Sequence, residues 1–584
     1  SVPTTGRPTV LERGRARGAD RRGPGRVGAR SPGAPTSVRF QEREPVDFVV
    51  IGAGSAGGIL AKELSTAGFS VVVLEQGPHR RAADFTHDEL GVFLSGGLEL
   101  PRADFPQTFR EREDEKAQSV PTPFGAYYAA GVGGSSVHFT ANFWRFRELD
   151  FRERSLLGPI PGTGFDDWPF GYDELEPYYA KVDWEIGVSG APGPFDPPRS
   201  RPYPMRPLPV KSSGVLFERG ARALGMNPQP APMAILSEPH NGRSPCGHCG
   251  FCLGFGCEYG AKSSTLAAMI PLAEATGRCE IRPLSTVARI EVDDAGRARE
   301  VVYYDERGEE RAQRARAVVL SANGAESARL LLMSESSRFP DGLANSSGLV
   351  GKYLMFNGQS TAHGLFDEPL NEFKSVQVTR ISWDFYESDP DRGFYGGGGM
   401  DGRCMAYPIM FGLAGLPPDA PTWGAEYKRR LSESFTRYMQ VAGHTTSLPV
   451  ASNNITLDPD LRDRFGRPAI RMTYRDHDDD LAAMRFFAER GAEILEAAGA
   501  REVWRTPVAP QNLGAHLLGT ARMGDDPGSS VVDPYHRTHD VPNLFVCDGS
   551  SFVTSGRGQP TMTIMALAFR AGEHLVRFAR RGEI

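Results

Sequence analysis

The apolar positions between residues 47 and 77 predict a strand, a helix and a second strand. A continuous apolar run at 48–51 is followed by glycines, and apolar residues then recur at helical spacing up to Ala67. A second apolar run at 71–74 ends on Glu75. Continuous apolar runs of this length are typical of buried strands, and a period of three to four residues is typical of a helix. The pattern therefore indicates a β-α-β unit.

Similar patterns recur along the rest of the chain. Predicted strands cover residues 280–283, 287–292, 300–304, 317–321, 454–457 and 469–472, and predicted helices run through residue 332 and over 478–497. The strands up to residue 321 are expected to complete a nucleotide-binding sheet, and the later ones to form a second sheet. Residues 79–124 read as a polar, irregular connection, and the glycine run at 396–399 is expected to be mobile.

The glycines between the first predicted strand and its helix have the spacing of a dinucleotide-binding turn. Gly52 allows the tight turn, Gly54 allows a pyrophosphate to approach the backbone, and Gly57 allows close packing of helix and strand. Ser55 opens the helix, whose free N–H groups and dipole favour phosphate. Glu75 lies where an acid binds the ribose hydroxyl groups of adenosine. The flanking strands, helix and acid favour nucleotide binding over a purely structural turn.

A second glycine-rich stretch covers residues 131–139. It contains Gly133, Gly134, Ser135 and, near its end, His138. Packed glycines and serines let the backbone lie flat against a planar ring. The stretch is therefore a candidate contact for the ring of a cofactor.

The C-terminal stretch carries further candidate residues. Asp548 and Gly549 follow a buried strand, where they would meet a cofactor from a second side. Pro560 is the expected first residue of a helix running to about residue 578, with Gln559 at its cap. The positive end of that helix can face a ring that becomes anionic on reduction.

Four of the seven cysteines, Cys246, Cys249, Cys252 and Cys257, define a cysteine-rich loop at 246–257. Glycines between them allow the loop to enclose a small group. The spacing resembles the ferredoxin pattern except in its last interval, so an iron-sulfur cluster is predicted here. A zinc ion held by four thiolates is one alternative, and free or disulfide-paired thiols with a structural role only are the other.

Length and composition limit the classes of protein to which the chain can belong. A chain of 584 residues is too long for one core, and its 40% hydrophobic and 24% charged content is ordinary for a soluble enzyme. The net charge of −6 argues against nucleic acid as a partner. No apolar run approaches the length of a transmembrane segment, and no apolar segment follows the basic start as in a signal peptide. On its own sequence the chain is expected in the cytoplasm.

Residues 1–44 differ from the rest. Ten arginines against four acidic residues give this segment a charge of +6, so that the remainder carries −12. Rich in Gly, Pro and Arg, the segment cannot bury enough apolar surface to fold alone. It is therefore predicted to be a disordered tail, and an arm that docks on a partner is the alternative.

Five motifs occur together: the glycine fingerprint with Glu75, Gly133-Gly134-Ser135-Ser136, Asp167-Trp168-Pro169, His516-x-x-Gly519-Thr520, and Pro560-Thr561-x-Thr563. From about residue 45 to its end, the chain thereby resembles the GMC (glucose-methanol-choline) oxidoreductase family. The resemblance implies an α/β fold: a Rossmann-like FAD-binding domain built from discontinuous segments, plus an α+β substrate domain with an antiparallel sheet. The FAD-binding domain would cover 45–160, 245–350 and 510–584, and the substrate-binding domain 161–244 and 351–509.

The resemblance also implies the residues that contact FAD. They are Gly52, Gly54, Ser55, Gly57, Glu75, Gly133, Gly134, Ser135, His138, Val287, Asp548, Gly549, Pro560, Thr561 and Met562. His138 matches the position that is covalently bonded to the flavin in pyranose oxidase-like members, and a polar contact without a bond is the alternative.

By its match to the motif, His516 is implied to be the base that accepts the hydroxyl proton while a hydride moves to flavin N5. A histidine that titrates near neutrality suits that task. Gln559 stands where the family carries His or Asn. An amide can orient a hydroxyl group but cannot accept its proton, so proton transfer is expected to rest on His516 alone. A helix cap is the alternative role for Gln559.

The cysteine-rich loop makes the chain similar to the flavin subunits of gluconate, fructose and glucoside 3-dehydrogenases. This similarity implies that electrons leave the flavin through an iron-sulfur cluster toward a cytochrome or quinone. It also implies a small companion subunit that carries an export signal, which would place the enzyme in the periplasm.

Three hypotheses for the function follow. The first is an FAD-dependent dehydrogenase of a sugar or other alcohol that uses an acceptor other than oxygen. The second is an oxygen-using alcohol or pyranose oxidase in which the cysteines are structural. The third is a catalytically inactive, flavin-bearing scaffold subunit, against which His516 argues.

Overall fold

The computed structural model describes residues 38–94, 96–405 and 407–584. Residues 1–37 of the predicted disordered tail lie outside this part of the chain. The described end of that segment is held by hydrogen bonds. The backbone N–H of Phe40 donates to Glu280 at 2.7 Å, and Arg282 donates to the Phe40 carbonyl oxygen at 2.8 Å. No described helix is both long enough and apolar enough to cross a membrane.

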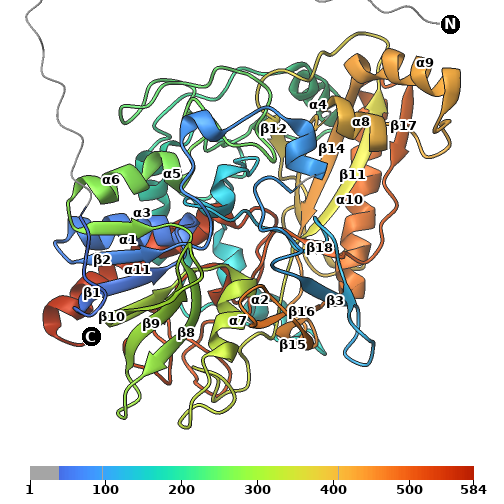
Figure 1. Ribbon diagram of the computed structural model, residues 1–584. Coiled ribbons are helices and arrows are strands. Elements are labelled where there is room, and N and C mark those ends of the chain that lie inside the picture. Colours follow the sequence, from blue (N-terminus) through green and yellow to red (C-terminus); the bar gives the residue numbers. More distant parts are fainter. Residues whose placement is uncertain (1–37, 95, 406) are drawn as a thin grey trace, which may run out of the picture. The chain divides into compact units, whose positions relative to one another are not determined.

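A seven-stranded sheet forms the first half of the described unit (Figure 1). Its order is β7 (Cys279–Arg282), β2 (Val71–Leu74), β1 (Val46–Ile51), β10 (Glu310–Leu320), β9 (Ala298–Tyr304) and β8 (Thr286–Val292), with β19 (Leu544–Val546) also paired to β10. Strands β7, β2, β1, β10 and β19 are parallel, whereas β8, β9 and the first part of β10 form an antiparallel meander. The predicted β-α-β unit and the strands up to residue 321 are therefore confirmed.

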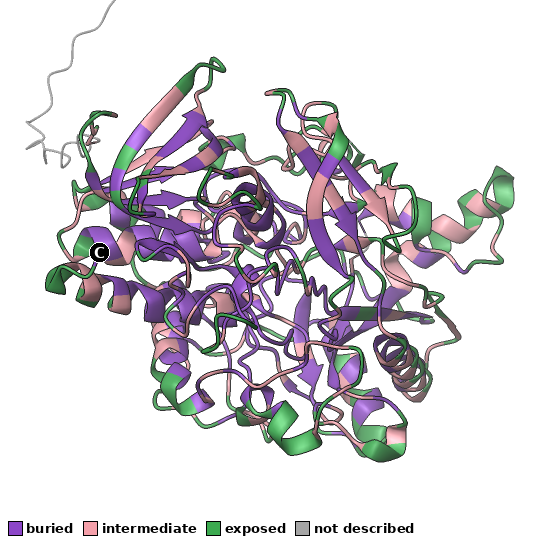
Figure 2. Cartoon of the chain, turned by 90° about the horizontal axis from the view of Figure 1, so that it is seen from below, coloured by how far each residue is buried: buried purple, intermediate pink, exposed green. Residues whose placement is uncertain are grey.

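Strands β1, β2 and β19 and the end of β10 are apolar and buried, since helices cover them, whereas the edge strand β7 is only partly buried. Helix α1 (Ser55–Thr66) follows the glycine turn and packs against α11 (Thr561–Arg581) and α6 (Ile270–Ala275). Helix α7 (Gly324–Met333) follows β10, and α3 (Tyr172–Val182) packs on α11. The aromatic residues Trp168, Phe170, Tyr172 and Tyr179 lie in the core. Figure 2 shows in purple the buried residues that fill the interior of the described unit.

A six-stranded antiparallel sheet forms the second half. Its order is β17 (Glu502–Arg505), β11 (Gly358–Leu365), β14 (Tyr438–Thr445), β13 (Gly398–Arg403), β12 (Val378–Ser382) and β6 (Gln229–Pro230). Helices α10 (Asp478–Ala497) and α4 (Ser212–Ala223) pack on one face of this sheet. The bounds predicted for the helix at 478–497 are confirmed.

The glycine run at 396–399 was expected to be mobile, and that expectation was wrong for its second half. Gly398 and Gly399 open β13, a central strand that pairs on both sides. A Cβ at Gly398 would lie 1.9 Å from the carbonyl oxygen of His444. Glycine is therefore needed here for close packing and not for flexibility.

Residues 79–124 are less irregular than predicted. They contain β3 (Gln107–Arg110) and β4 (Gln118–Ser119), which join β15 (Asn454–Arg462) and β16 (Pro468–Thr473) in a four-stranded sheet. Strands β15 and β16 confirm the strands predicted at 454–457 and 469–472, and they lie in a sheet separate from the seven-stranded one. The remaining elements are the pair β5 (Gly125–Ala126) and β18 (Leu513–Gly514), and helices α2 (Glu153–Leu157), α5 (Thr265–Ala268), α8 (Pro408–Ala414) and α9 (Gly424–Ser434).

Replacement of Gly57 by alanine tests the packing of α1 on β1. The new Cβ would lie 1.9 Å from the carbonyl oxygen of Gly52, so strand and helix must separate. We expect Gly57→Ala to lower the free energy of unfolding by about 1–3 kcal/mol, as overpacking usually does. Gly412→Ala in α8 is the control, because its Cβ would meet only the Tyr427 hydroxyl oxygen, at an ordinary 3.7 Å. Chemical denaturation of both variants measures the difference, and equal stabilities would contradict the prediction.

Candidate active site

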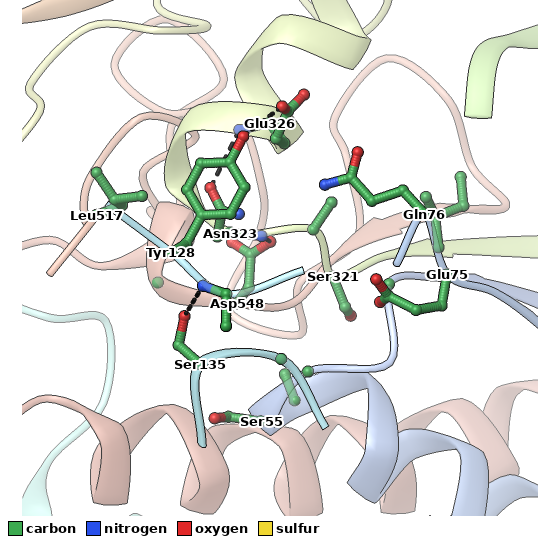
Figure 3. Close-up of a pocket in the computed structure, with 18 of the residues that line it drawn as sticks. Ser55, Glu75, Gln76, Tyr128, Ser135, Ser321, Asn323, Glu326, Leu517 and Asp548 are labelled. Carbon is green, nitrogen blue, oxygen red and sulfur yellow. Dashed lines mark hydrogen bonds between the residues drawn. The ribbon is translucent and has the colours of Figure 1, made fainter. Parts of the chain in front are cut away.

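A cavity lies at the carboxyl ends of the parallel strands, where α/β folds bind their ligands (Figure 3). It encloses about 1180 Å³ of empty space, part of which is open to solvent. The predicted site residues that line it are Gly52, Gly54, Ser55, Glu75, Gly134, Ser135, Val287, His516, Asp548, Gly549, Pro560 and Thr561. Segments from four distant parts of the chain therefore meet around one space.

The glycine turn lets backbone segments touch with no side chain between them. Gly52 has a φ of +95°, and a Cβ there would lie 2.5 Å from the carbonyl oxygen of Ser321. A Cβ at Gly134 would lie 2.7 Å from Cα of Gly54, so the two glycine-rich stretches are in direct contact. Gly57 and Gly133 do not line the cavity; they pack behind it. The glycine turn at 52–57, the N-terminus of α1 and the glycine-rich stretch at 131–139 together fit a dinucleotide.

Glu75 joins both glycine-rich stretches. Its carboxylate accepts hydrogen bonds from the backbone N–H groups of Ala53 at 3.0 Å, Gly77 at 2.9 Å and Gly131 at 3.1 Å. Burial raises the pKa of Glu75, and the three N–H groups oppose that shift. The carboxylate also lines the cavity, where its remaining lone pairs can accept ribose hydroxyl groups. The sequence did not predict the hydrogen bond between the Gly131 N–H group and Glu75.

His138 is buried beside the cavity-lining stretch but does not line the cavity itself. Among the described residues, neither of its ring nitrogens has a hydrogen-bond partner. Burial lowers the pKa of His138 to about 3, with a smaller contribution from Lys262. A buried imidazole without partners fits contact with a bound group.

Asp548 lines the cavity, yet its carboxylate is occupied by the protein. One oxygen accepts from the backbone N–H and hydroxyl of Ser550, and the other accepts from the Ser327 hydroxyl and the Asn323 N–H. The side chain therefore fixes the turn after β19 against the start of α7. A cofactor would therefore contact the parts of this turn that border the cavity, and not the Asp548 carboxylate.

Helix α11 begins one residue later than predicted. Pro560 is its N-cap residue and Thr561 its first residue, and no side chain caps this end. Pro560 and Thr561 line the cavity, so the positive end of the helix faces it. Met562 is instead buried in the core. Gln559 caps nothing, and its amide nitrogen lies 3.2 Å from Nδ1 of His444.

His516 borders the cavity just after β18. Burial lowers the pKa of this imidazole to about 4, and nearby His444 adds to the shift. The ring is therefore uncharged at neutral pH, and the expectation that this histidine titrates near neutrality is not met. Its Nδ1 lies 3.2 Å from the side-chain oxygen of Asn357.

Asn357 fixes the tautomer of His516. The Asn357 amide nitrogen lies 3.2–3.3 Å from the backbone carbonyl oxygens of Thr445, Ser555 and Gly556, which can only accept. The Asn357 oxygen must therefore face His516 and accept the proton of Nδ1–H. Nε2 then carries the free lone pair, so the ring can accept a proton at that atom. Asn357 has a φ of +62°, a conformation that Asn adopts more readily than most residues.

A second histidine, the buried His444, joins the site from β14. Its Nε2 lies 3.0 Å from Asp401 Oδ2, and Arg403 pairs with the same carboxylate. Burial would raise the pKa of Asp401, but Arg403 and His444 hold it at about 2. Sequence patterns missed Asn357, His444 and Asp401, because His444 and Asp401 lie in ordinary strands and Asn357 directly precedes one, all far in sequence from the motifs.

The four clustered cysteines lie in a loop next to His138, whose carbonyl oxygen accepts a hydrogen bond of 2.7 Å from Gly254. All four are free thiols, and burial raises the pKa of Cys246 to about 11 and of Cys252 to about 12. Across residues 38–94, 96–405 and 407–584, no group of three or more His, Cys, Asp or Glu side chains is arranged to hold a metal ion. The arrangement therefore gives no support to the predicted iron-sulfur cluster or to zinc.

A Rossmann-type cavity bordered by an uncharged histidine with a free lone pair is typical of nucleotide-dependent oxidoreductases. Two family models described as GMC oxidoreductase match residues 163–355 and 449–568. Together they cover more than half of the chain. The chain belongs to the GMC oxidoreductase family.

Individual relatives agree with this membership. The chain is 36% identical to a 2-methyl-1,2-propanediol dehydrogenase of Mycolicibacterium austroafricanum, over 91% of this chain and 96% of the relative. It is 30% identical to the fructose dehydrogenase large subunit of Gluconobacter japonicus, over 92% and 98% of the two chains. A solved structure of formate oxidase from Aspergillus oryzae RIB40 has a TM-score of 0.62 at 15% identity, covering 93% of this chain and all of that one.

The predicted family and fold class are thereby confirmed, and the chain is a flavin-dependent oxidoreductase. The cavity fits FAD, since close-packed glycines, a helix N-terminus and a buried carboxylate surround it. The cavity is therefore the expected place of the cofactor.

Replacement of Glu75 by glutamine tests this placement. The amide would set an N–H donor against backbone N–H donors, and an unsatisfied buried group costs about 1–3 kcal/mol. We expect Glu75→Gln to weaken FAD binding by about tenfold to a hundredfold, as measured by titration of apoprotein with FAD. Glu433→Gln on exposed α9 is the control, because among the described residues this carboxylate pairs with Arg429 alone. Unchanged affinity in Glu75→Gln would exclude a role for the carboxylate in holding the cofactor.

Proposed function

We propose that this enzyme oxidises a hydroxyl group of a small alcohol, polyol or sugar to a carbonyl group, with His516 as the base. The observation that carries the proposal is the uncharged His516 ring, whose Nδ1–H is held by Asn357 and whose Nε2 keeps its lone pair. Removal of a hydride from an alcohol carbon requires loss of the hydroxyl proton, and Nε2 can accept that proton.

The chain's own residues would bind the cofactor, orient the substrate and move the proton. The glycine turn, Glu75 and the start of α11 would hold FAD, which supplies the two-electron acceptor for the hydride when it is bound. Gln559 would orient the substrate by hydrogen bonds. Because burial keeps the pKa of His516 low, the imidazolium formed in the reaction readily passes its proton on to solvent.

We further propose that the electrons leave the flavin for an acceptor other than oxygen. Support comes from the two relatives reported above, both of which are named dehydrogenases. One of them is named a large subunit, which favours a companion protein for this chain as well. The cysteine-rich loop enters the proposal as a structural element next to His138, in which burial raises the pKa of Cys246 to about 11 and of Cys252 to about 12.

Replacement of His516 tests the base. We expect His516→Ala to lower kcat/KM by about 10²- to 10⁴-fold, the usual contribution of a general base, while FAD absorbance is retained. Anaerobic stopped-flow reduction of the flavin by a panel of diols, aldoses and ketoses measures the rate. His539→Ala is the control, because His539 contacts Ser530 outside the cavity. Equal rates in His516→Ala and the wild type would refute the assignment.

The pH profile tests the charge state of the same residue. Only uncharged His516 can accept a proton, and its pKa lies near 4. We therefore expect kcat/KM to stay level from neutral pH down to about pH 5 and to fall about tenfold per pH unit below the pKa. A decline already centred near the ordinary histidine value of about 6.5 would contradict an uncharged, buried base.

The acceptor is tested by turnover in air-saturated buffer with and without an artificial quinone. We expect steady turnover only with the quinone and little hydrogen peroxide without it. Peroxide formed in step with product would establish an oxidase instead. No flavin reduction by any hydroxyl compound would favour a scaffold without catalysis.

A further inference from the structure

The hydrogen bond between His516 and Asn357 joins two segments of the chain, and a third segment packs against both. Beside this pair, Met355 and Leu518 exchange backbone hydrogen bonds of 3.0 and 3.2 Å. The third segment, residues 474–476, connects β16 to α10 (Figure 1) and contacts the other two through side chains. The pair is therefore held by backbone contacts and by the side chains of a separate segment.

Stacked aromatic rings make the first of these side-chain contacts. The rings of Tyr474 and Phe356 are buried, with their centroids 3.8 Å apart and their planes at 21°. Gly514 packs against the same Phe356 ring, since a Cβ there would lie 2.2 Å from a ring carbon atom. The three segments are therefore in direct contact next to His516 and Asn357.

The second side-chain contact is a hydrogen-bond network centred on Asp476. The backbone N–H of Gln511 donates to Asp476 Oδ2 at 2.6 Å, and the Gln511 amide nitrogen donates to Oδ1 at 2.8 Å. The same amide nitrogen donates to the backbone carbonyl oxygen of Asn357 at 3.2 Å. A carboxylate and a carbonyl oxygen can only accept, so the orientation of the Gln511 amide is fixed. Asp476 thereby holds Gln511, and Gln511 holds Asn357.

The network requires the carboxylate of Asp476. Only 3% of this residue is exposed, and both of its oxygens face N–H donors. Burial raises the pKa of Asp476, whereas the donors of Gln511 and the Tyr474 hydroxyl group oppose that shift. The ionised carboxylate accepts from every one of these donors, and an amide in its place has only one acceptor oxygen.

We propose that Asp476 is a positioning residue that acts through Gln511 to hold Asn357 and His516 in the arrangement that the base requires. Gln511 binds the Asn357 backbone and lies five residues before His516, so its release from Asp476 loosens both partners of the His516–Asn357 hydrogen bond. The imidazole can then rotate or carry its proton on Nε2, and fewer molecules present a lone pair to the substrate. This inference rests on the proposed oxidation of an alcohol at His516.

Replacement of Asp476 by asparagine tests the inference. The side chain keeps its size, but its NH₂ group meets an N–H donor of Gln511. We expect the rate of flavin reduction at saturating substrate to fall about tenfold, the worth of one buried hydrogen bond. KM should stay within about twofold, because the loss concerns the step of proton transfer. The affinity for FAD should not change, since neither residue lines the cavity.

The ¹⁵N NMR signals of His516 give a readout that a loss of stability alone does not move. In the wild type we expect a proton on Nδ1 only. In folded Asp476→Asn at neutral pH we expect a mixture of the two neutral forms, because Asn357 no longer accepts from Nδ1–H in every molecule.

Asp458→Asn is the matched control. Asp458 is also buried, and its carboxylate likewise accepts from two backbone N–H groups and from a hydroxyl group, that of Thr108 at 2.8 Å. It lies in the four-stranded sheet, on β15, and makes none of its hydrogen bonds to the segments that hold His516. This variant should leave the rate of flavin reduction and the His516 signals unchanged.

Gln511→Leu extends the test and keeps it decisive if Asp476→Asn does not fold. The variant loses the amide but keeps the backbone N–H that binds Asp476. We expect it to slow flavin reduction about threefold to tenfold and to give the same mixture of His516 signals. Because both residues act through one network, the double variant should lose no more than Asp476→Asn alone.

The possible outcomes separate this inference from the proposed function. Wild-type protein whose flavin no hydroxyl compound reduces refutes the proposed function, and the inference with it. A functional wild type refutes the inference alone if Asp476→Asn reduces its flavin as fast as Asp458→Asn, if its His516 signals match the wild type, or if the losses of the two single variants multiply in the double variant. Slower reduction, mixed His516 signals and non-additive losses together support it.

Discussion

The site depends on close contact between backbone segments at the carboxyl ends of the parallel strands. Gly52 lies against Ser321, and Gly134 lies against Gly54, so closely that neither Gly52 nor Gly134 has room for a Cβ atom. Glu75 strengthens this contact, since its carboxylate binds N–H groups from both glycine-rich stretches. Three segments far apart in the sequence thereby form one cradle. Side chains at these positions would separate the strands from the cofactor that they are shaped to hold.

The charges around the cavity follow one rule: carboxylates are fixed by donors, and histidines are kept uncharged. Asp548 and Glu75 accept hydrogen bonds from backbone and hydroxyl groups, while Asp401 is paired with Arg403. Burial lowers the pKa of His516 and His444. A buried charge without a partner costs several kcal/mol, so this arrangement is what a buried site can sustain. It leaves His516 free to accept a proton during the reaction.

The fold was largely predictable from the sequence, because short apolar runs, glycine turns and helical periodicity are local signals. The β-α-β unit, the strands up to residue 321 and the helix at 478–497 all follow from such signals. The glycine run at 396–399 was misjudged, since its reason lies in contacts with β14 and two tryptophans that no local pattern records. The strand at 107–110 was missed because its partner, β16, lies more than 350 residues later.

The candidate site was predictable only where it consists of motifs. His516, Glu75 and the glycines belong to recognisable spacings, whereas Asn357, His444 and Asp401 are single residues brought in by the second sheet. Their roles come from hydrogen bonds across 43 to 159 positions of sequence. The cysteine-rich loop shows the opposite case, in which a dense spacing suggested a metal centre that the arrangement of the described side chains does not support.

The tautomer of His516 is the most direct test of the account, because both the proposed base and its orientation depend on it. We would record ¹⁵N NMR spectra of the holoenzyme with labelled histidine and assign the His516 signals by their loss in His516→Asn. At neutral pH we expect a protonated Nδ1 and an unprotonated Nε2 in His516. A proton on Nε2, or an imidazolium with both nitrogens protonated, would contradict it, since neither form has a lone pair facing the substrate.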